Sequence, residues 1–121
     1  KSAQKEVDTV NRISPQTFEG EWSKDSYVVD VRKETEYAAE HVDEAYNKPL
    51  DSINNWFMEM DDSKPFYLHC AGGYRSMIAA SILKSRGVHN FKEVDGGFAA
   101  IAKTQLPKTD FVCQSKLQKL S

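Results

Sequence analysis

The chain has 121 residues, of which 40% are hydrophobic and 28% charged, a length and composition typical of one globular domain with its own core. Its 16 Lys and Arg and 18 Asp and Glu give a net charge of -2, and neither sign forms a long run. This balance disfavours nucleic acid and membrane surfaces as partners and favours small or protein-borne ones.

Targeting signals and paired cysteines are not evident in the sequence. No apolar stretch approaches the roughly 20 residues that a membrane helix needs, and the N-terminal residues lack the apolar core of a signal peptide. The two cysteines, Cys70 and Cys113, and the three histidines are too scattered to indicate a zinc site. We expect a soluble, cytoplasmic chain with reduced cysteines rather than a disulfide. Because the sequence begins without Met, it is also compatible with a domain cut from a longer protein.

The first half of the chain predicts a helix, a strand and a second helix. Ser14 followed by Pro15 predicts a helix start, because serine caps free amides and proline suits the first helical position. This helix is expected over residues 15–22. Residues 27–31 form a β-branched, mostly apolar run without alternation, typical of a strand covered on both faces. A short helix is expected over residues 32–41.

The middle of the chain predicts a short strand at residues 45–47 and a helix over residues 51–60. The helix is expected because its apolar side chains recur at helical spacing; these residues are Ile53, Trp56, Phe57 and Met60. Residues 66–68 then make a bulky strand that leads directly into His69 and Cys70.

The last third predicts a helix, a strand and a further helix. Apolar residues after Gly73 recur at three- and four-residue spacing, and Arg86 followed by Gly87 is a typical helix ending. A strand is expected at residues 91–94, and a helix at residues 98–103. Strands that alternate with helices predict an α/β fold with a parallel sheet flanked by helices on both faces. In such sheets ligands bind beyond the carboxyl ends of the strands, where the loop after Cys70 emerges.

The stretch HCAGGYRS, residues 69–76, combines features of an anion site. If it curls at the start of the following helix, its N–H groups and the positive end of the helix point toward the Cys70 sulfur. Both favour a thiolate, the nucleophilic form. Arg75 adds a permanent positive charge, and Gly72 and Gly73 leave room for an anion. Residue types alone equally allow a buried structural thiol.

Three motifs resemble those of rhodanese-like sulfurtransferase domains. Residues 67–87 resemble the family's active-site loop and helix, in which a cysteine, two variable residues, glycine, one variable residue and Arg-Ser recur. The matching residues are Cys70, Gly73, Arg75 and Ser76. Residues 28–50 resemble the family's upstream landmarks, matched by Asp30, Arg32, Glu36, Tyr37, His41, Asn47 and Pro49. Residues 93–101 resemble its double-glycine segment.

The resemblance covers about residues 10–104 and implies a sheet of about five parallel strands, with 105–121 as a C-terminal extension of one single domain, 1–121. It implies a sulfurtransferase in which Cys70 takes a sulfane sulfur from thiosulfate or a persulfide and gives it to a thiol or cyanide. The loop would hold the terminal sulfur through Ala71, Gly72, Gly73, Tyr74 and Arg75. Asp30, Arg32 and Ser76 would support it. No metal or organic cofactor is implied.

Two other functions remain alternatives. Phosphatases of the cell-cycle type and arsenate reductases share this architecture but place five residues between cysteine and arginine, whereas four separate Cys70 from Arg75. The shorter loop suits one sulfur atom better than a tetrahedral phosphate. The other alternative is a non-catalytic docking module of a larger sulfur-metabolism protein, linked to its partner domain or separate from it. The presence of Cys70 argues against it.

Several side chains near these motifs have open or structural roles. Arg75 either binds the donor or clamps the loop through a carboxylate. Asp30 and Arg32 are expected to buttress the site, since polar groups at strand ends need partners. His69 precedes Cys70 and therefore points to the opposite side of the strand. We expect Cys113 to be inert rather than to resolve a persulfide.

The turn after the second predicted helix departs from the family pattern. Acidic residues replace the usual glycines and proline; they are Glu40, Asp43 and Glu44. If they lie near the mouth of the site, they would repel an anionic donor such as thiosulfate and favour a thiol persulfide or a protein donor.

Overall fold

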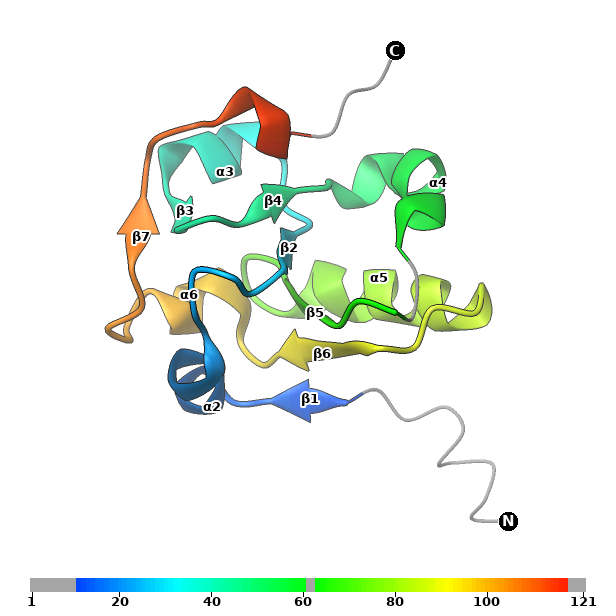
Figure 1. Ribbon diagram of the computed structural model, residues 1–121, viewed down its shortest axis with the longest axis horizontal. Coiled ribbons are helices and arrows are strands. Elements are labelled where there is room, and N and C mark those ends of the chain that lie inside the picture. Colours follow the sequence, from blue (N-terminus) through cyan, green and yellow to red (C-terminus); the bar gives the residue numbers. More distant parts are fainter. Residues whose placement is uncertain (1–10, 61–62, 118–121) are drawn as a thin grey trace.

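A five-stranded parallel sheet forms the centre of the molecule (Figure 1), in a computed structural model that describes residues 11–60 and 63–117. Its strand order is β1-β6-β5-β2-β4, and all four neighbouring pairs run parallel. The strands are β1 (Arg12–Ile13), β2 (Val28–Asp30), β4 (Tyr46–Asn47), β5 (Phe66–His69) and β6 (Phe91–Val94). A separate antiparallel pair joins β3 (His41–Val42) to β7 (Lys108–Thr109). The predicted α/β fold with a five-stranded parallel sheet is therefore confirmed.

Helices cover both faces of the sheet. They are α2 (Pro15–Glu21), α3 (Glu34–Ala39), α4 (Ile53–Trp56), α5 (Tyr74–Ser85) and α6 (Gly97–Ile101). One buried cluster joins the sheet to α4 and α5, and the other joins it to α2, α3 and α6. The adjacent residues Val28 and Val29 enter opposite clusters and are both fully buried. An apolar run without alternation thus belongs to a strand with both faces covered.

The first helix begins as its sequence predicts. The Ser14 side chain accepts a 3.0 Å hydrogen bond from the Thr17 backbone N–H, and Pro15 occupies the first helical position. The second helix is shorter than expected. It begins at Glu34, where the Glu36 carboxylate accepts a hydrogen bond from the Lys33 backbone N–H, and it ends before the extended Glu40.

The single helix expected over residues 51–60 is wrong, because three short pieces take its place. They are the 3-10 turn η1 (Leu50–Ser52), α4 and the 3-10 turn η2 (Phe57–Glu59). The backbone leaves ideal helical geometry at Ser52 and Trp56, whose φ angles are -111° and -113°. Both side chains hydrogen-bond to the Pro49 carbonyl, which draws the segment toward the preceding turn. Apolar spacing identified the buried face but not these competing hydrogen bonds.

The segment that follows α6 packs against the rest of the chain. Leu106 is 3% exposed, β7 pairs with β3, and Leu117 forms a parallel bridge with Asn47. A 3-10 turn, η3 (Gln114–Lys116), precedes that bridge. Residues 118–121 of the expected extension lie outside the described residues.

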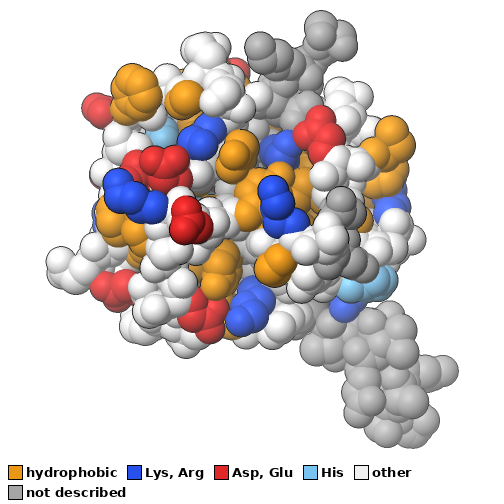
Figure 2. All heavy atoms as spheres, in the orientation of Figure 1, with side chains coloured by type: hydrophobic (Ala, Val, Ile, Leu, Met, Phe, Trp, Pro, Cys, Tyr) orange, Lys and Arg blue, Asp and Glu red, His pale blue; other side chains and the backbone are white. Residues whose placement is uncertain are grey.

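The surface agrees with the balanced composition. Acidic and basic side chains are interspersed over the face seen in Figure 2, without a large patch of one sign. Of the helices in the described residues, none has both the length and the apolar character needed to span a bilayer.

Candidate functional site

Cys70 lies at the carboxyl end of β5, directly before the N-terminus of α5. Gly73 caps this 12-residue helix in the left-handed region, with φ of 100°, and its N–H donates a 3.0 Å hydrogen bond to the Cys70 Sγ. Positive φ is the region that glycine adopts without a steric penalty. Cys70 itself is only 1% exposed. The thiol therefore sits under its loop, where the helix dipole and at least one backbone amide favour a negative charge on sulfur.

The double glycine at the start of α6 lies against this loop. The N–H of Phe98 donates to the Cys70 carbonyl at 2.6 Å, and the N–H of Ala99 donates to the Ala71 carbonyl at 2.9 Å. Gly97 has φ of 61°, and a Cβ there would lie 2.5 Å from the Cys70 carbonyl oxygen. Only glycine allows the start of α6 to approach the loop so closely.

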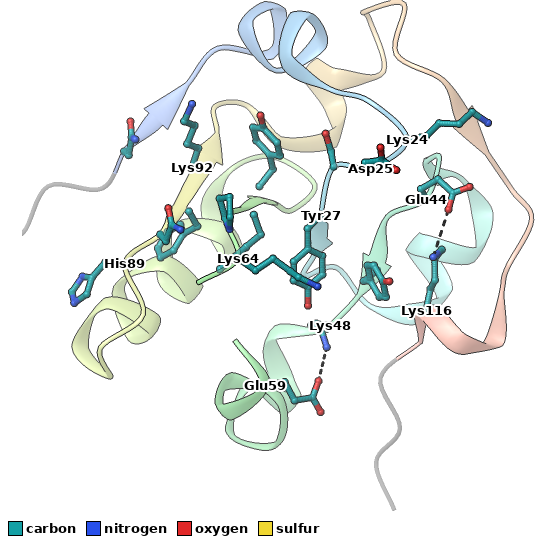
Figure 3. Close-up of a pocket in the computed structure, with 18 of the residues that line it drawn as sticks. Lys24, Asp25, Tyr27, Glu44, Lys48, Glu59, Lys64, His89, Lys92 and Lys116 are labelled. Carbon is teal, nitrogen blue, oxygen red and sulfur yellow. Dashed lines mark hydrogen bonds and ion pairs between the residues drawn. The ribbon is translucent and has the colours of Figure 1, made fainter. Parts of the chain in front are cut away.

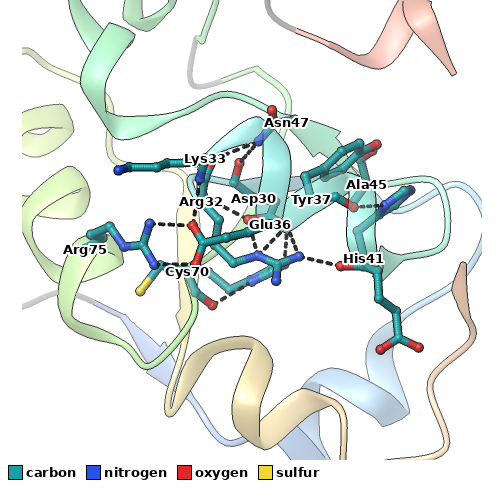
Figure 4. A network of polar contacts seen from close by, with 12 residues as sticks. Asp30, Arg32, Lys33, Glu36, Tyr37, His41, Ala45, Asn47, Cys70 and Arg75 are labelled. Atoms are coloured by element: carbon teal, nitrogen blue, oxygen red, sulfur yellow. Dashed lines mark hydrogen bonds and ion pairs between the residues drawn. The ribbon is translucent and has the colours of Figure 1, made fainter. Parts of the chain in front are cut away.

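Arg75 binds the carboxylate of Glu36 on α3 (Figure 4). The two hydrogen bonds measure 2.8 Å from Nη1 and 3.0 Å from Nη2. These bonds lower the pKa of Glu36 to about 2 and raise the pKa of Arg75, to which the charge of Cys70 adds a smaller effect. The sequence left donor binding and clamping open for Arg75. In the structure, Arg75 and Glu36 clamp α5 to α3, and the guanidinium remains near enough to the thiol for the charge of Cys70 to affect it.

Asp30 and Arg32 form a buried ion pair at the end of β2. The guanidinium donates to both carboxylate oxygens at 2.8 to 3.0 Å, and the Arg32 N–H donates to Asp30 Oδ1 at 2.9 Å. Arg32 also donates to the Glu40 carbonyl at 2.7 Å and lies 4.3 Å from the centre of the Phe98 ring. The pair thus joins β2 to the end of α3 and to α6. Asn47 completes it by donating to the carbonyls of Asp30 and Arg32.

His69 is fully buried and stacks on Phe98 of α6. Phe98 belongs to the buried cluster on the opposite face of the sheet from the cluster that contains Cys70. Its Nδ1 lies 3.1 Å from the Cys70 carbonyl, and its Nε2 lies 3.9 Å from Asp30 Oδ2. Burial lowers the pKa of His69, although the charge of Asp30 opposes this effect. A neutral imidazole that donates from Nδ1 fits this geometry and fixes the backbone at Cys70.

Ser76 reaches a carboxylate that sequence reasoning missed. Its Oγ donates a 2.6 Å hydrogen bond to Oε2 of Glu93, a residue of β6 that is 1% exposed. Arg12 on β1 donates two hydrogen bonds to Oε1 of the same carboxylate, at 3.0 Å and 2.8 Å. Glu93 lies in the strand predicted at residues 91–94, but its neighbour Lys92 is also charged and is only partly buried, so the sequence alone did not single out the buried carboxylate.

The comparisons with known proteins agree with this geometry. A family model described as a rhodanese-like domain matches residues 14–104. The chain belongs to the rhodanese-like family. The solved structure of a rhodanese-related protein from Thermoplasma volcanium superposes with a TM-score of 0.75 at 24% identity, over 84% of this chain and 99% of that one. This likeness concerns the fold.

Two curated relatives extend the comparison. An uncharacterized protein, slr1261 of Synechocystis, is 32% identical over 96 residues, which are 78% of this chain and 54% of the relative. A thiosulfate sulfurtransferase, GlpE of Pseudomonas entomophila, is 32% identical over 87 residues, 72% of this chain and 80% of that protein. The rhodanese-like chain thus spans about half the length of the Synechocystis relative.

The three acidic residues in the turn of this rhodanese-like domain make different contacts. The Glu44 carboxylate lies 3.5 Å from Lys116 Nζ, and the Asp43 N–H donates to the Pro107 carbonyl beside β7. Only Glu40 joins the polar network of the site, and it does so through its backbone carbonyl. The expectation that these three residues repel an anionic donor stays a prediction.

His41 and Cys113 make their contacts outside the Cys70 loop. His41 is buried, stacks on Tyr37 with ring centres 3.7 Å apart, and binds the Tyr37 carbonyl through Nδ1. The Cys113 Sγ lies 3.1 Å from the Ser115 hydroxyl, a hydrogen bond that lowers the pKa of this half-buried cysteine. Both cysteines are free. In the part of the chain that is described, no group of three or more His, Cys, Asp and Glu could hold a metal ion.

A second hollow in the described part of the rhodanese-like domain lies at the other end of the sheet. It measures about 1070 Å³, follows the amino ends of the strands, and has Tyr27, Lys64 and Lys92 among its lining residues (Figure 3). It contains none of residues 69–76. A hollow of about 300 Å³ borders the Cys70 loop instead, between Gly72 and Tyr74 on one side and Arg12 on the other. We assign the candidate site to the loop, because the hydrogen bonds and helix end around the Cys70 thiol are better evidence for a site than the greater volume of the other hollow.

Proposed function

We propose that this rhodanese-like domain is a sulfurtransferase that moves a sulfane sulfur through a persulfide on Cys70. The donor is thiosulfate or a persulfide, and the acceptor is a thiol or cyanide. The observation that carries the proposal is the hydrogen bond from the Gly73 N–H to the Cys70 Sγ at the start of α5. The similarity to a protein named thiosulfate sulfurtransferase supports the same chemistry.

The proposed reaction has two balanced steps. The Cys70 thiolate attacks the outer sulfur of thiosulfate, a new S–S bond forms, and sulfite leaves with the electrons of the broken S–S bond. Cyanide or a thiolate then attacks the outer sulfur of the Cys70 persulfide. The Cys70 S–S bond breaks, its electrons return to the Cys70 sulfur, and thiocyanate or a new persulfide departs. No external oxidant or reductant is consumed, and no metal or organic cofactor takes part in the proposal.

The loop supplies the anion stabilisation that both steps need. The backbone of Ala71, Gly72, Gly73, Tyr74 and Arg75 follows the thiol, and α5 directs its positive end to the same place. Arg75 acts here by holding the loop against Glu36, while Asp30, Arg32 and Ser76 fix the surrounding backbone. Preorganised dipoles stabilise charge without moving during the reaction.

The burial of Cys70 favours a second candidate, a docking module of a larger sulfur-metabolism protein. A side chain that is 1% exposed fits a structural thiol as well as a guarded nucleophile. The partner would be another domain, covalently linked or separate. Phosphatase and arsenate reductase chemistry is the weaker alternative, because only four residues lie between Cys70 and Arg75.

The two candidates differ in what thiosulfate does to the protein. Intact mass after mild thiosulfate treatment should show a one-sulfur adduct that cyanide removes, and turnover should release thiocyanate. Cys70→Ser should abolish both signals, whereas Cys113→Ser, the matched control, should retain them. Thiocyanate release that persists in Cys70→Ser would contradict the proposal, and a wild-type protein without adduct or turnover would favour the docking module.

The proposal also includes a compartment. Free cysteines at positions 70 and 113 fit a reducing environment, so we propose the cytoplasm. The substrates are then small sulfur compounds or thiols carried by proteins.

A further inference from the structure

Three arginines surround the Cys70 loop, and each is bound to a carboxylate. Arg75 pairs with Glu36 on α3, Arg32 pairs with Asp30 on β2, and Arg12 pairs with Glu93 across β1 and β6. The N–O distance is 2.8 Å in all three pairs. His69 directly precedes Cys70, and burial favours its neutral form. The three arginines beside the loop are therefore all in ion pairs, and Asp95, which lines the hollow beside Gly72 and Gly73, adds a carboxylate that stays constant when Arg12 or Glu93 is changed.

The third pair touches the helix that carries the loop. Glu93 is buried and accepts three hydrogen bonds, two from the half-exposed Arg12 and one from Ser76. Arg12 and Glu93 are also direct partners in the strand register, so β1 brings the guanidinium to the carboxylate. A buried carboxylate with these partners is fixed in position.

Ser76 connects the Glu93 carboxylate to the residues that contact the thiol. It is the third residue of α5, and its Oγ lies 2.6 Å from Glu93 and 3.3 Å from the Gly73 carbonyl. The N–H of the same Gly73 donates to the Cys70 Sγ. Glu93 therefore holds the first turn of α5 in place. Its negative charge, however, is linked to the Cys70 sulfur through only Ser76 and Gly73, and it opposes an anion on that sulfur.

We propose that Arg12 and Glu93 form a charge-balanced anchor for the Cys70 loop. Glu93 positions the first turn of α5 through Ser76, and Arg12 cancels the effect of this carboxylate on the sulfur anion. Both are positioning residues, and neither touches sulfur. The inference deepens the proposed sulfur transfer, and its role in turnover rests on that function.

The two halves of the pair have opposite effects on the thiolate. Arg12→Gln keeps a hydrogen-bond donor but leaves the carboxylate uncompensated, which slows reaction of Cys70 with a thiol reagent. Glu93→Gln keeps an acceptor but leaves the guanidinium uncompensated, which speeds that reaction. A partly screened unit charge that is separated from the sulfur by these two residues changes the rate by about three- to tenfold. The double variant returns to within about twofold of the parent, because both charges are gone.

The experiment measures methylthiolation of Cys70 by methyl methanethiosulfonate at pH 7 in a Cys113→Ser background. In this reaction the thiolate attacks the methylthio sulfur and methanesulfinate leaves, so no donor or acceptor of the proposed function is involved. Controls are Lys92→Gln and Glu21→Gln, which break an ion pair that includes the neighbouring residue of β6. These controls should leave the rate within about twofold of the parent, because their charges lie away from the loop.

Opposite changes in the single variants, with recovery in the double variant, support the anchor. Changes of the same sign in both singles, with no recovery, overturn it in favour of a purely mechanical contact. If Arg12→Gln alone fails to fold, the comparison of Glu93→Gln with the double variant carries the same test, since only Arg12 differs between them. A protein that passes this test but releases no thiocyanate disproves the proposed function and not the anchor.

Discussion

At the scale of single residues, Arg75 holds one carboxylate beside the loop, that of Glu36, in its ionised form. Hydrogen bonds from Arg75 lower the pKa of Glu36 from 4.5 to about 2. A carboxylate whose pKa is lower in the folded than in the unfolded state stabilises the fold above its unfolded pKa. That stability is lost as the pH falls from about 4.5 toward 2. Both side chains are about one third exposed, which moderates the effect.

We therefore expect the free energy of unfolding to fall between pH 5 and pH 3 less steeply in Glu36→Gln than in the parent. Urea unfolding at the two pH values measures this difference. Arg75→Gln is the matched control, because removing the cause of the low pKa should flatten the pH dependence to a similar degree. A parent slope that neither substitution alters would mean that other carboxylates control the acid response.

At the scale of elements, the loop is held by the start of α6 as much as by α5. Two backbone hydrogen bonds from α6 reach the carbonyls of Cys70 and Ala71, and Gly97 is the residue that permits this approach. The helix has only five residues, so its position depends on these contacts and on buried Phe98 and Ile101.

Gly97→Ala should lower sulfur transfer by more than about tenfold and destabilise the fold by about 1–3 kcal/mol, because its φ is positive and its Cβ would collide with the loop backbone. Thiocyanate release and thermal unfolding measure the two effects. Gly20→Ala provides the comparison, since no atom lies within 4 Å of its Cβ position in α2. That change should stabilise the protein by about 0.5–1 kcal/mol. Equal effects of the two substitutions would argue against a special role of Gly97.

The same elements show what the sequence could predict. The start of α2, the buried strand β2 and the turn into α5 follow from local signals, namely Ser14 with Pro15, a continuous apolar run and paired glycines. Strands of two residues, such as β1 and β7, are too short to show any periodicity. The partners of Arg75 and Ser76 lie 39 and 17 residues away, so their pairing depends on the fold and not on local sequence.

At the scale of the whole molecule, the segment after α6 packs into the same hydrophobic core as the helix that supports the candidate site. Leu106 enters the cluster that also holds Phe98 and Ile101, and these two belong to the helix that supports the Cys70 loop. We therefore propose that residues 105–117 complete the domain rather than follow it as a separate extension.

Leu106→Ala should destabilise the protein by about 2–4 kcal/mol, the usual range for truncating a buried leucine. Urea unfolding gives this value. Phe111→Ala is the control in the same segment, because its side chain is 72% exposed, and we expect a change below about 0.5 kcal/mol. A Leu106→Ala protein as stable as the parent would show that this segment contributes nothing to the core.

The pairing of every arginine around the loop has a consequence for ionic strength. Dissolved salt screens exposed charges over about 8–10 Å at physiological concentrations but acts little on buried amides and helix dipoles. Methylthiolation of Cys70 should therefore change by less than about twofold between 0.05 and 1 M potassium chloride. In Glu93→Gln the half-exposed Arg12 loses its carboxylate, and its accelerating effect should fade as salt is added. A domain whose arginines around the loop are all paired in this way keeps the same reactivity of the Cys70 thiol at low and at high salt concentration.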